Sequence, residues 1–557
     1  MLKRKDGQQK SRRRGRQATP EALAAVTPYL DAGTARRDRL IEYLHRIQDD
    51  RGYLESGLLT ALAERLKLST SEVYEVASFY HHFDLVKSGE TPPPSLTVRV
   101  CDSISCSMAG ADPLIRELQA ALGNHVRIQP VPCVGRCEIA PVAVVGTHPV
   151  PFATPERVQD AINQGNRDEP IPDQAMDYST YLEADGYGQL KGVLNDGEAN
   201  HETIIQTLEN AKLRGLGGAG FPTGSKWRIV RDYPAPRLMA VNIDEGEPGT
   251  FKDHYYLKRN PHRFLEGMLI AATVVDAAKI YIYLRDEYAG IRKLLQRELD
   301  ALIRNPPCPL PPIELRRGAG AYICGEESAM IESIEGKRGI PRLRPPYIAE
   351  KGLFGRPTLE HNMETLYWVP ELLEKGPDWF SAQGRNGRYG LRSFSVSGRV
   401  KKPGVYLAPA GITLNELIAE YCGGMQKGHR LKAYFPGGAS GGILPASLAD
   451  IPLDFDTLHE YGCFIGSAAI IILSDQDSVR EQALNAMRFF ADESCGQCTP
   501  CRVGTEKAAT LMSEQEWDQP LLQELCQVMS DASICGLGQA APNPLRSALK
   551  YFPEEFA

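Results

Sequence analysis

The sequence has no uninterrupted apolar run of 18 residues, the length at which a helix becomes a candidate for spanning a bilayer. The basic cluster at residues 12–14 is not followed by the apolar stretch that a twin-arginine or secretory signal needs. Positive charge is not in excess either, because the 557 residues carry a formal net charge of -7, which gives no general attraction to nucleic acid. These absences predict a cytoplasmic protein that binds neither a membrane nor nucleic acid.

The content of apolar residues, 42%, and of charged residues, 24%, is ordinary for a globular protein. The length predicts about three or four domains, each large enough for its own core. The chain has 13 cysteines, and in a cytoplasmic protein these favour metal binding over disulfides. Eight of them fall into two tight groups, so we expect the chemistry of this chain to lie there.

Composition shifts, proline-rich breaks and changes of hydrophobic period divide the chain into predicted segments. Together they predict a multidomain fold of the α/β and α+β classes. The segments are 1–18, a disordered basic tail; 19–90, a helical domain; 91–162, a small α/β domain with the first cysteine group; 163–180, a linker; 181–385, a glycine-rich α/β domain; 386–477, a β-grasp-like insert; and 478–557, a helical domain with the second cysteine group.

The pattern in the N-terminal domain is helical, with breaks expected near Gly33, Gly52 and Gly57. Ser69 and Glu72 have the spacing of a capping box in front of an apolar stripe. The adjacent pair His81 and His82 would point in different directions on a helix, so we interpret both as core or surface histidines rather than metal ligands.

The first cysteine group follows predicted strands. Cys101 and Cys106 leave the strand 96–100, and Cys133 and Cys137 leave the strand 126–131. Asp112 and Pro113 are expected to cap the helix between these strands. Four thiolates on two loops suit a [2Fe-2S] cluster or a tetrahedral zinc site. The C-x4-C and C-x3-C spacings favour iron-sulfur, because structural zinc pairs more often use C-x2-C turns.

A dense glycine run extends over residues 215–227, after a predicted helix at 203–213. Glycines let the backbone approach a ligand, and the amides that follow can hold a phosphate. Gly215, Gly217 and Gly220 also satisfy the G-x-G-x-x-G fingerprint, which should follow a strand. The helix in front of the run disfavours a Rossmann site and leaves an anion site of another kind as the better interpretation.

Acidic residues accompany two turns of this glycine-rich domain. The predicted strand 238–244 runs into the acidic turn 245–249, and a second glycine-rich turn with acids lies at 318–327. Predicted helices at 264–278 and 287–303 alternate with the strand 279–284, so we expect a parallel or mixed sheet. Two such turns in one domain favour a binding function over solvated loops.

The second cysteine group lies in helical sequence that starts near Ser478. Cys495, Cys498 and Cys501 have C-x2-C-x2-C spacing, and Cys535 follows after a long gap. Three closely spaced thiolates can hold one face of a cubane and a fourth can close it, so a [4Fe-4S] cluster is expected. The other cysteines are expected to be buried as small apolar residues.

These motifs resemble a known family. Residues 215–227, 242–249, 318–327 and 495–535 resemble the flavin- and NADH-binding subunit of respiratory complex I. Residues 20–150 resemble its thioredoxin-like [2Fe-2S] subunit. In complex I these two subunits are usually separate proteins. A fusion of both in one chain is therefore more similar to the diaphorase subunits of NAD-dependent formate dehydrogenases and NAD-reducing hydrogenases than to complex I. Of these two, we favour the formate dehydrogenase beta subunits.

The resemblance implies that the glycine-rich domain binds FMN, with NAD(H) stacked on it. The protein would position hydride transfer between nicotinamide C4 and flavin N5, with one-electron steps through the clusters following. Glu247 would be the catalytic residue, tuning hydride transfer and product release. The implied FMN and NAD residues are Gly215, Gly217, Gly218, Phe221, Lys226, Asn242, Asp244, Glu245, Glu247, Tyr322, Gly325, Glu326, Glu327, Arg344, Tyr347, Asn362 and Thr365.

The sequence departs from the family pattern at several positions. Leu216 replaces an arginine of the first turn, and Ile229 replaces an aromatic residue. Arg344 and Tyr347 stand where the family has lysine and phenylalanine, so the charge and the ring persist. Nucleotide binding is therefore expected to survive.

The partner implied by the resemblance is a molybdenum- or tungsten-containing formate dehydrogenase alpha subunit, since no molybdopterin, tungsten or nickel-iron site is found in this chain. A diaphorase subunit of an NAD-reducing hydrogenase and a fused NADH dehydrogenase module of complex I are the alternatives. Two further alternatives are an electron-transfer module that never binds NAD and a zinc-stabilised scaffold. Flavin absorbance bleached by NADH would exclude the first, and acid-labile sulfide the second.

Overall fold

A computed structural model describes residues 17–556 and divides the chain into two compact units. Unit 1 comprises the described residues up to Pro93 together with Glu335–Arg338, and unit 2 comprises Pro94–Ile334 and the chain from Gly339 onward. Most of the predicted basic tail, residues 1–16, lies outside the described residues. Within the described part, no helix is both long and apolar enough to cross a membrane.

Unit 1 is helical, as predicted. The capping box of Ser69 and Glu72 is present, and Gly52 ends a helix with a φ of +81°, as expected of a C-terminal glycine. Gly57 does not interrupt a helix: it is the second residue of one, where a glycine costs little helix stability. The elements are α1 (Pro20–Val26), α2 (Leu40–Arg51), α3 (Ser56–Leu66), α4 (Thr70–Phe79) and the parallel strand pair β1 (Leu54–Glu55) and β2 (Leu85–Val86).

A short segment from the middle of the chain, Glu335–Arg338, completes unit 1. The Tyr80 hydroxyl donates to the Lys337 carbonyl oxygen at 2.7 Å, and an Arg338 nitrogen lies 3.5 Å from a Glu75 carboxylate oxygen. The N-terminal unit is therefore built from two stretches that are far apart in the sequence.

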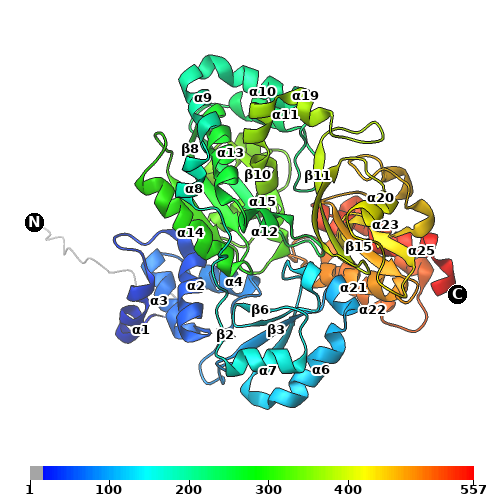
Figure 1. Cartoon of the computed structure of the whole chain (residues 1–557). Coiled ribbons are helices and arrows are strands. Elements are labelled where there is room, and N and C mark those ends of the chain that lie inside the picture. Colours follow the sequence, from blue (N-terminus) through cyan, green and yellow to red (C-terminus); the bar gives the residue numbers. More distant parts are fainter. Residues whose placement is uncertain (1–16, 557) are drawn as a thin grey trace, which may run out of the picture. The chain divides into compact units, whose positions relative to one another are not determined.

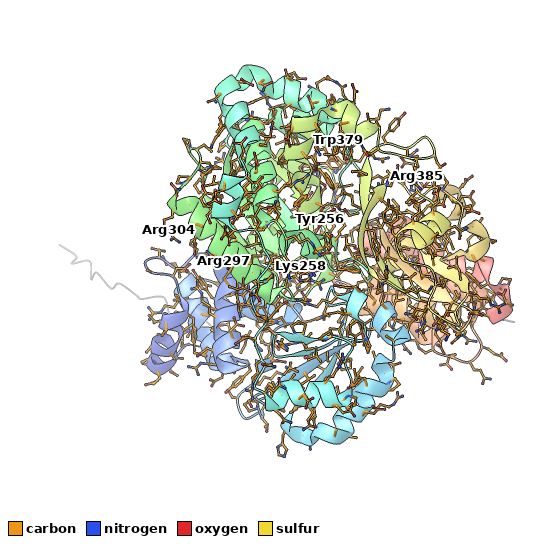
Figure 2. All side chains as sticks on the ribbon, viewed as in Figure 1. Tyr256, Lys258, Arg297, Arg304, Trp379 and Arg385 are labelled. Atoms are coloured by element: carbon orange, nitrogen blue, oxygen red, sulfur yellow. The ribbon has the colours of Figure 1, made fainter. Side chains whose placement is uncertain are left out.

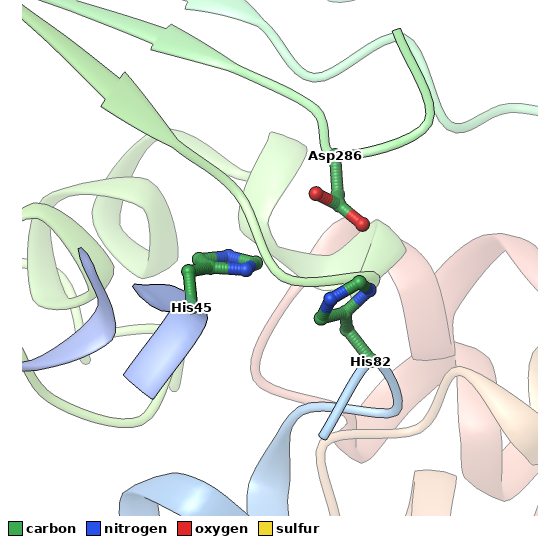
Figure 3. A group of neighbouring side chains, drawn as sticks. All are labelled: His45, His82 and Asp286. Atoms are coloured by element: carbon green, nitrogen blue, oxygen red, sulfur yellow. The ribbon is translucent and has the colours of Figure 1, made fainter. Parts of the chain in front are cut away.

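His81 is exposed and His82 is half-buried, as the adjacent pair predicts. The His82 ring lies 4.8 Å from the His45 ring, centroid to centroid, and packs on Phe83 (Figure 3). Asp286, also drawn in Figure 3, belongs to unit 2. Within unit 1, the rings of His45 and His82 thus pack against each other.

The first sheet of unit 2 carries the first cysteine group. Its strand order is β4-β3-β5-β6, with β3 and β4 parallel and the other pairs antiparallel. Its core is formed by alternate residues of the central strand, Val98 and Val100, with Leu114 and Leu118 from the covering helix. The elements are β3 (Thr97–Cys101), α5 (Ile104–Met108), α6 (Ala111–Leu122), β4 (Arg127–Val131), β5 (Ala143–Val145), β6 (His148–Val150) and α7 (Pro155–Asn163).

The predicted cap of the covering helix is wrong. Helix α6 begins at Ala111 after Gly110, whose φ of +95° suits glycine. Asp112 and Pro113 lie in the first turn, where a carboxylate and a missing N–H are both tolerated.

The second sheet of unit 2 is entirely parallel, with the order β10-β7-β8-β9. Two of its strands, β8 and β10, are labelled in Figure 1. Helix α13 is buried along almost its whole length beside it, as its apolar sequence dictates. The elements are α8 (Tyr178–Glu183), α9 (Gly188–Asp196), α10 (His201–Asn210), α11 (Thr223–Arg231), β7 (Arg237–Ile243), α12 (Lys252–Leu257), α13 (Pro261–Val274), β8 (Ala277–Leu284), α14 (Ala289–Arg304), β9 (Ile313–Arg317), α15 (Glu327–Ile334), α16 (Ile348–Lys351), β10 (Thr358–Asn362), α17 (Met363–Tyr367), α18 (Val369–Lys375) and α19 (Pro377–Ser381).

The predicted helix before the glycine run, the strand before the acidic turn and the next strand are confirmed, as α10, β7 and β8. Strands β9 and β10 were not foreseen, and β10 forms one edge of the sheet. Helix α8 begins at Tyr178, inside the segment predicted as a linker, and the predicted domain boundaries stay a prediction.

The insert is a five-stranded mixed sheet with the order β12-β11-β15-β13-β14 and one helix. Its central strand β15 is buried at every residue and pairs with β11 and β13. The elements are β11 (Leu391–Gly398), β12 (Gly404–Pro409), α20 (Leu414–Glu420), β13 (Leu431–Phe435), β14 (Leu444–Pro445) and β15 (Ala469–Ser474).

The C-terminal part is helical and starts at the expected place, since Ser478 caps its first helix by accepting from the Glu481 amide. Gly504 and Met529 pack together where two of its helices meet, because a Cβ at Gly504 would lie 2.6 Å from Met529. The helices are α21 (Val479–Asp492), α22 (Thr499–Met512), α23 (Gln519–Ala532), α24 (Gly536–Ala540) and α25 (Asn543–Tyr551).

Candidate functional site

The first four cysteines converge in the interior of unit 2. Cys101, Cys106, Cys133 and Cys137 are 1%, 2%, 2% and 5% exposed. Cys133 Sγ lies 3.4 Å from Cys137 Sγ and accepts from the Gly135 amide. Thiol hydrogen bonds from Cys101 and Cys137 hold the pKa of Cys133 well below its usual value. Four buried sulfurs, linked pairwise by thiol hydrogen bonds and with one thiolate already favoured, are a donor set that suits an iron-sulfur cluster.

Side chains from the parallel sheet reach this cysteine loop. The Arg285 guanidinium donates to the Cys133 carbonyl at 2.7 Å and to the Glu245 carbonyl. The Tyr288 hydroxyl donates to a Glu245 carboxylate oxygen at 2.8 Å. Phe251 packs directly on Cys133 and Cys137. The acidic turn and the first thiol set are therefore held together by hydrogen bonds and one aromatic ring.

The glycine-rich turn is tightly folded. The Gly215 amide donates to the Phe221 carbonyl at 2.8 Å, which closes the turn at its base. A Cβ at Gly217 would lie 2.9 Å from Asn362 Cβ, so the backbone fits there only without a side chain. Gly218 has a φ of +126°, which strains any other residue. Leu216, the departure from the family pattern, is buried, and its amide donates to Thr365 Oγ1 at 2.9 Å.

Lys226, on α11, faces acids of the parallel sheet. Its Nζ lies 2.8 Å from Glu360 Oε2 and 4.0 Å from a Glu327 oxygen. Burial disfavours the ammonium, yet the two carboxylates outweigh it and raise the pKa of Lys226. The amide of Asn242 joins the group by donating to Glu360 and to the Gly325 carbonyl. The site thus holds one fixed cation that a phosphate could approach.

The acidic turn starts from two neighbouring carboxyls, those of the partly buried Asp244 and the buried Glu245. Among the described residues, Asp244 Oδ2 is buried without a hydrogen-bond partner, and burial raises the Asp244 pKa well above its usual value. Glu245 accepts from the Asp253 and His254 amides, and burial, with the charge of Asp253, raises the pKa of Glu245 to about 8. An orphaned acceptor in an interior site fits a ligand that supplies hydroxyls.

Glu247 is buried and lies between two parts of unit 2. One carboxylate oxygen accepts from the Ser440 amide at 2.7 Å, and the other accepts from the Tyr322 hydroxyl. Burial raises the pKa of Glu247 against the opposing effect of the Tyr322 hydrogen bond. The Tyr322 amide in turn donates to Glu493 at 2.8 Å, two residues before Cys495. The acidic turn is thereby connected to the second thiol set as well.

Glu326 caps α15, accepting from the Ser328 and Ala329 amides, and also receives a hydrogen bond from Arg344. Arg344 also lies 3.4 Å from Glu327. Two aromatic rings implied in nucleotide binding, Phe221 and Tyr347, are 48% and 59% exposed. Exposed rings beside charged side chains can stack on a planar ligand that arrives from solvent.

Asn362 and Thr365 lie where β10 passes into α17. The Asn362 amide donates to Asp253 at 2.7 Å, and its oxygen accepts from the Glu364 amide. Behind it, the buried Lys252 ammonium lies 2.9 Å from both Asp253 and Glu364. This fully buried ion group fixes Asn362 against the glycine-rich turn.

The second thiol set lies at helix starts. Cys498 precedes α22, Cys501 lies in its first turn, and Cys535 precedes α24. The pKa of Cys535 is raised by burial, with the neighbouring thiols of Cys495 and Cys501 adding to the shift. Cys501 and Cys535 are buried, whereas Cys495 and Cys498 are partly exposed. The donor set suits a cluster that lies near the surface.

Several residues of the site were missed by sequence reasoning. Glu360, Arg285 and Phe251 are examples. Glu360 gave no usable signal, because four of the five residues of β10 are polar. Arg285 and Tyr288 follow strand β8, at the carboxyl edge of a parallel sheet where sites form, which was a signal for both. The departure at Ile229 is an exposed side chain.

Tyr256, labelled in Figure 2, shows how the insert meets the site: its hydroxyl oxygen and Ser393 Oγ are 2.6 Å apart. Thr250 Oγ1 and Ser467 Oγ are 2.7 Å apart in the same region. Within unit 2, the insert and the parallel sheet therefore share a polar interface beside the acidic turn.

Comparison with known families matches four models along the chain. Residues 26–166 match a thioredoxin-like [2Fe-2S] ferredoxin, and residues 208–371 match the Nuo51 FMN-binding domain. Residues 393–444 match the SLBB domain, and residues 481–557 match the NADH-ubiquinone oxidoreductase-F iron-sulfur binding region. The predicted multidomain fold is confirmed.

Among curated relatives, an NADH-quinone oxidoreductase F-type subunit of Rhizobium meliloti is 38% identical over 401 residues, 69% of this chain and 94% of the relative. The corresponding F-type protein of Aquifex aeolicus is 40% identical over 393 residues, 68% of this chain and 89% of the relative. The crystal structure of an NAD+-reducing [NiFe]-hydrogenase in the H2-reduced state covers 94% of this chain with a TM-score of 0.81 and 31% identity; 92% of its own chain is matched.

The predicted cofactors are confirmed at the level of these domains: FMN, NADH, a [2Fe-2S] cluster and a [4Fe-4S] cluster. The buried first thiol set, the partly exposed second set, the glycines of the turn and the Asp244 oxygen without a hydrogen-bond partner fit those groups. The chain belongs to the family of F-type subunits of NADH-quinone oxidoreductase and carries a thioredoxin-like [2Fe-2S] ferredoxin domain in front of the part that it shares with them.

Proposed function

We propose that the chain is the diaphorase subunit of a multi-subunit oxidoreductase, passing electrons between NAD(H) and a partner catalytic subunit. The observation that carries the proposal is the acidic turn, which is hydrogen-bonded through Arg285 to the first thiol loop and through Tyr322 to Glu493 beside the second. FMN supplies the exchange between two-electron hydride chemistry and one-electron steps when it is bound. The chain's own residues hold it between the two thiol sets.

The individual residues have proposed roles. Gly215, Gly217 and Gly218 leave room for the flavin, Lys226 faces its phosphate, and Asn242, Asp244 and Asn362 accept from or donate to its polar groups. Glu247, Phe221, Arg344 and Tyr347 are proposed for the nucleotide. The remaining proposed flavin residues are Glu245, Tyr322, Gly325, Glu326, Glu327 and Thr365.

Glu247 is the proposed catalytic residue. Its carboxylate is already held by Tyr322 and Ser440, so its position is fixed before the nucleotide binds. A fixed carboxylate repels negative charge that develops nearby, and it accepts hydrogen bonds from the nucleotide amide. The same group therefore affects both the binding of the nucleotide and its release after hydride transfer.

For the partner we propose a molybdenum- or tungsten-containing formate dehydrogenase alpha subunit in the cytoplasm, on the strength of the fused domain organisation. A second candidate is the diaphorase role in an NAD-reducing hydrogenase. It is supported by a solved hydrogenase chain that matches this one over nearly its whole length, including the N-terminal extension. A complex I module is the third, because the curated relatives are quinone oxidoreductase subunits.

The test is isolation of the full chain with its natural partner from the source cells. We expect FMN, two iron-sulfur signals and NADH-dependent dye reduction, together with formate-dependent reduction of NAD+. Reduction of NAD+ by hydrogen in place of the formate reaction would support the second candidate, the hydrogenase diaphorase. Reduction of quinone by NADH would support the third, the complex I module. A chain that holds both clusters but neither binds flavin nor oxidises NADH would refute the diaphorase role itself.

A further inference from the structure

The base of the glycine-rich turn is closed by one side chain, Arg214. Its Nε donates to the Gly220 carbonyl at 2.5 Å, and its backbone bridges antiparallel to Pro222. The guanidinium thus fixes the last glycine of the turn from outside. A turn with four glycines loses much backbone entropy when it becomes ordered. A contact that orders the turn before the ligand arrives removes this cost from binding and so raises the affinity for the ligand.

The segment from β11 to β15, residues 391–474, contains the SLBB match at 393–444, and this SLBB part supplies the surface on which Arg214 rests. Arg214 Nη1 lies 2.5 Å from Asp456 Oδ2, and the guanidinium carbon lies 4.5 Å from the centre of the Phe455 ring. A Cβ at Gly220, whose φ is +65°, would lie 2.6 Å from Phe455, so the ring occupies the place of a side chain there. Phe455 is only 6% exposed. The turn is therefore covered by residues from a different domain.

The covering segment is itself fixed. Arg392 lies 3.9 Å from the Phe455 ring centre and 2.7 Å from Asp454, and Arg388 contacts Asp454 and the Phe455 carbonyl, each at 2.8 Å. Arg392 lies in β11 and is buried. Two cations and the sheet thus hold one aromatic ring in position against the turn.

We propose that Phe455 and Asp456 are positioning residues of the flavin site and act through Arg214. They fix the Gly220 end of the turn, so the SLBB part sets how tightly the flavin is held without touching the hydride-transfer atoms. The proposal rests on the proposed placement of FMN at residues 215–221.

The experiment titrates FMN into the full-length chain after the flavin has been removed, with both clusters present. Phe455→Leu keeps the bulk and loses the ring, and we expect the FMN Kd to rise about tenfold, the size of one desolvated cation–π contact. Asp456→Asn should raise it about threefold, as for a partly exposed ion pair. The control is Asp450→Asn, an exposed aspartate of the same part that contacts only Asn415 among the pairs described, and it should leave the Kd unchanged.

Double variants distinguish a positioning role from a general loss of folding, because effects on the FMN Kd that act through one residue do not add. In an Arg214→Gln background, Asp456→Asn should weaken FMN binding no further, and Phe455→Leu, whose ring also lies against Gly220, should weaken it by clearly less than tenfold. At saturating FMN, kcat and the KM for NADH should match the parent, and both cluster signals should persist. A tenfold loss that survives in the Arg214→Gln background, or a Kd within twofold of the parent for both variants, overturns the proposal. If Phe455→Leu does not fold, Asp456→Asn carries the same comparison.

Gly217→Val distinguishes an error in the positioning role from an error in the proposed placement of FMN. If Gly217→Val retains FMN at parental affinity, the placement of the flavin is wrong. If it loses FMN while the Phe455 and Asp456 variants do not, only the positioning role is wrong.

Discussion

The two thiol sets of unit 2 differ in how their ligands are presented. The four cysteines of the first set are 5% exposed or less and follow strands β3 and β4. The second set lies at the starts of α22 and α24, and two of its members, Cys495 and Cys498, are partly exposed. A cluster whose ligands are partly exposed can approach a docked protein more closely than one whose ligands are all buried. We therefore expect the second set to be the exit toward the partner.

The comparison is tested most strongly by removing one exposed ligand. Cys498→Ala should remove the [4Fe-4S] signal and abolish electron exchange with the partner, while NADH still reduces the flavin. Electron paramagnetic resonance and partner-dependent turnover measure the two effects. Cys308→Ala, a partly exposed cysteine outside both groups, is the matched control. Loss of flavin reduction in a folded Cys498→Ala protein would contradict the separation of the two sites.

A change at the turn between the sets should affect the flavin alone. Gly217→Val places a branched side chain against Asn362, and overpacking of about 1–3 kcal/mol lowers FMN affinity roughly ten- to hundredfold. Both iron-sulfur signals should remain. The control is Gly192→Ala, at a helical glycine with open space around it. Equal loss of flavin in both variants would mean that the effect is one of folding.

Unequal burial predicts unequal loss of iron. Treatment of the oxidised protein with a chelator should remove iron from the second set about ten times faster than from the first, because exposed segments open at lower free energy. The decay of the two spectroscopic signals gives the rates. Equal rates would show that the burial difference has no consequence in solution.

Glu247→Gln tests the connection of the turn to the nucleotide. A hydrogen bond to a charged group contributes about 1.5–3 kcal/mol, so NADH affinity should change by roughly one to two decades, with tighter retention and slower turnover. Iron content should not change. Glu460→Gln, at an exposed glutamate, is the control. A change of less than about twofold in both NADH affinity and turnover would make Glu247 a structural residue of the turn.

The last prediction concerns the protonation of Glu245 in the turn. Because the pKa of Glu245 is raised to about 8 by burial and by Asp253, the folded chain keeps a proton that the unfolded chain releases. Stability should therefore fall as pH rises from about 4.5, the usual value, to about 8. Glu245→Gln should flatten that part of the profile of melting temperature against pH. An unchanged slope would show that Glu245 is ionised in the fold.

Local signals in the sequence were sufficient for several of the elements. Cysteine spacing, the capping box and the strand before the acidic turn depend on neighbours a few residues away, and each is found as expected. Strand β10 was missed because four of its five residues are polar, among them the buried His361 and Glu360, so it lacks the apolar pattern that marks a buried strand. Those side chains are satisfied by Trp227 and Lys226, more than 100 residues away in sequence.

Contacts between domains could not be predicted from periodicity. Arg285 reaching the Cys133 carbonyl and Phe455 covering Gly220 depend on how separately folded parts pack. The cap at Gly110 was missed because Asp112 and Pro113 gave a stronger local signal than a glycine with positive φ. Whether the residues carried over from the family bind FMN and NADH stays a prediction.

Because Glu335–Arg338 belongs to the N-terminal unit, a cut after Pro93 does not yield two complete pieces. A fragment ending there would lack the partner of the Tyr80 hydroxyl, and the remainder would carry that partner exposed on a loop. The two fragments would thus hold complementary parts of one folding unit, and co-expressed halves would have a built-in means of reassociation. The N-terminal unit is thus completed by a segment from the middle of the chain and does not simply precede the rest. Removing the first 93 residues is therefore a poor way to obtain a minimal flavoprotein.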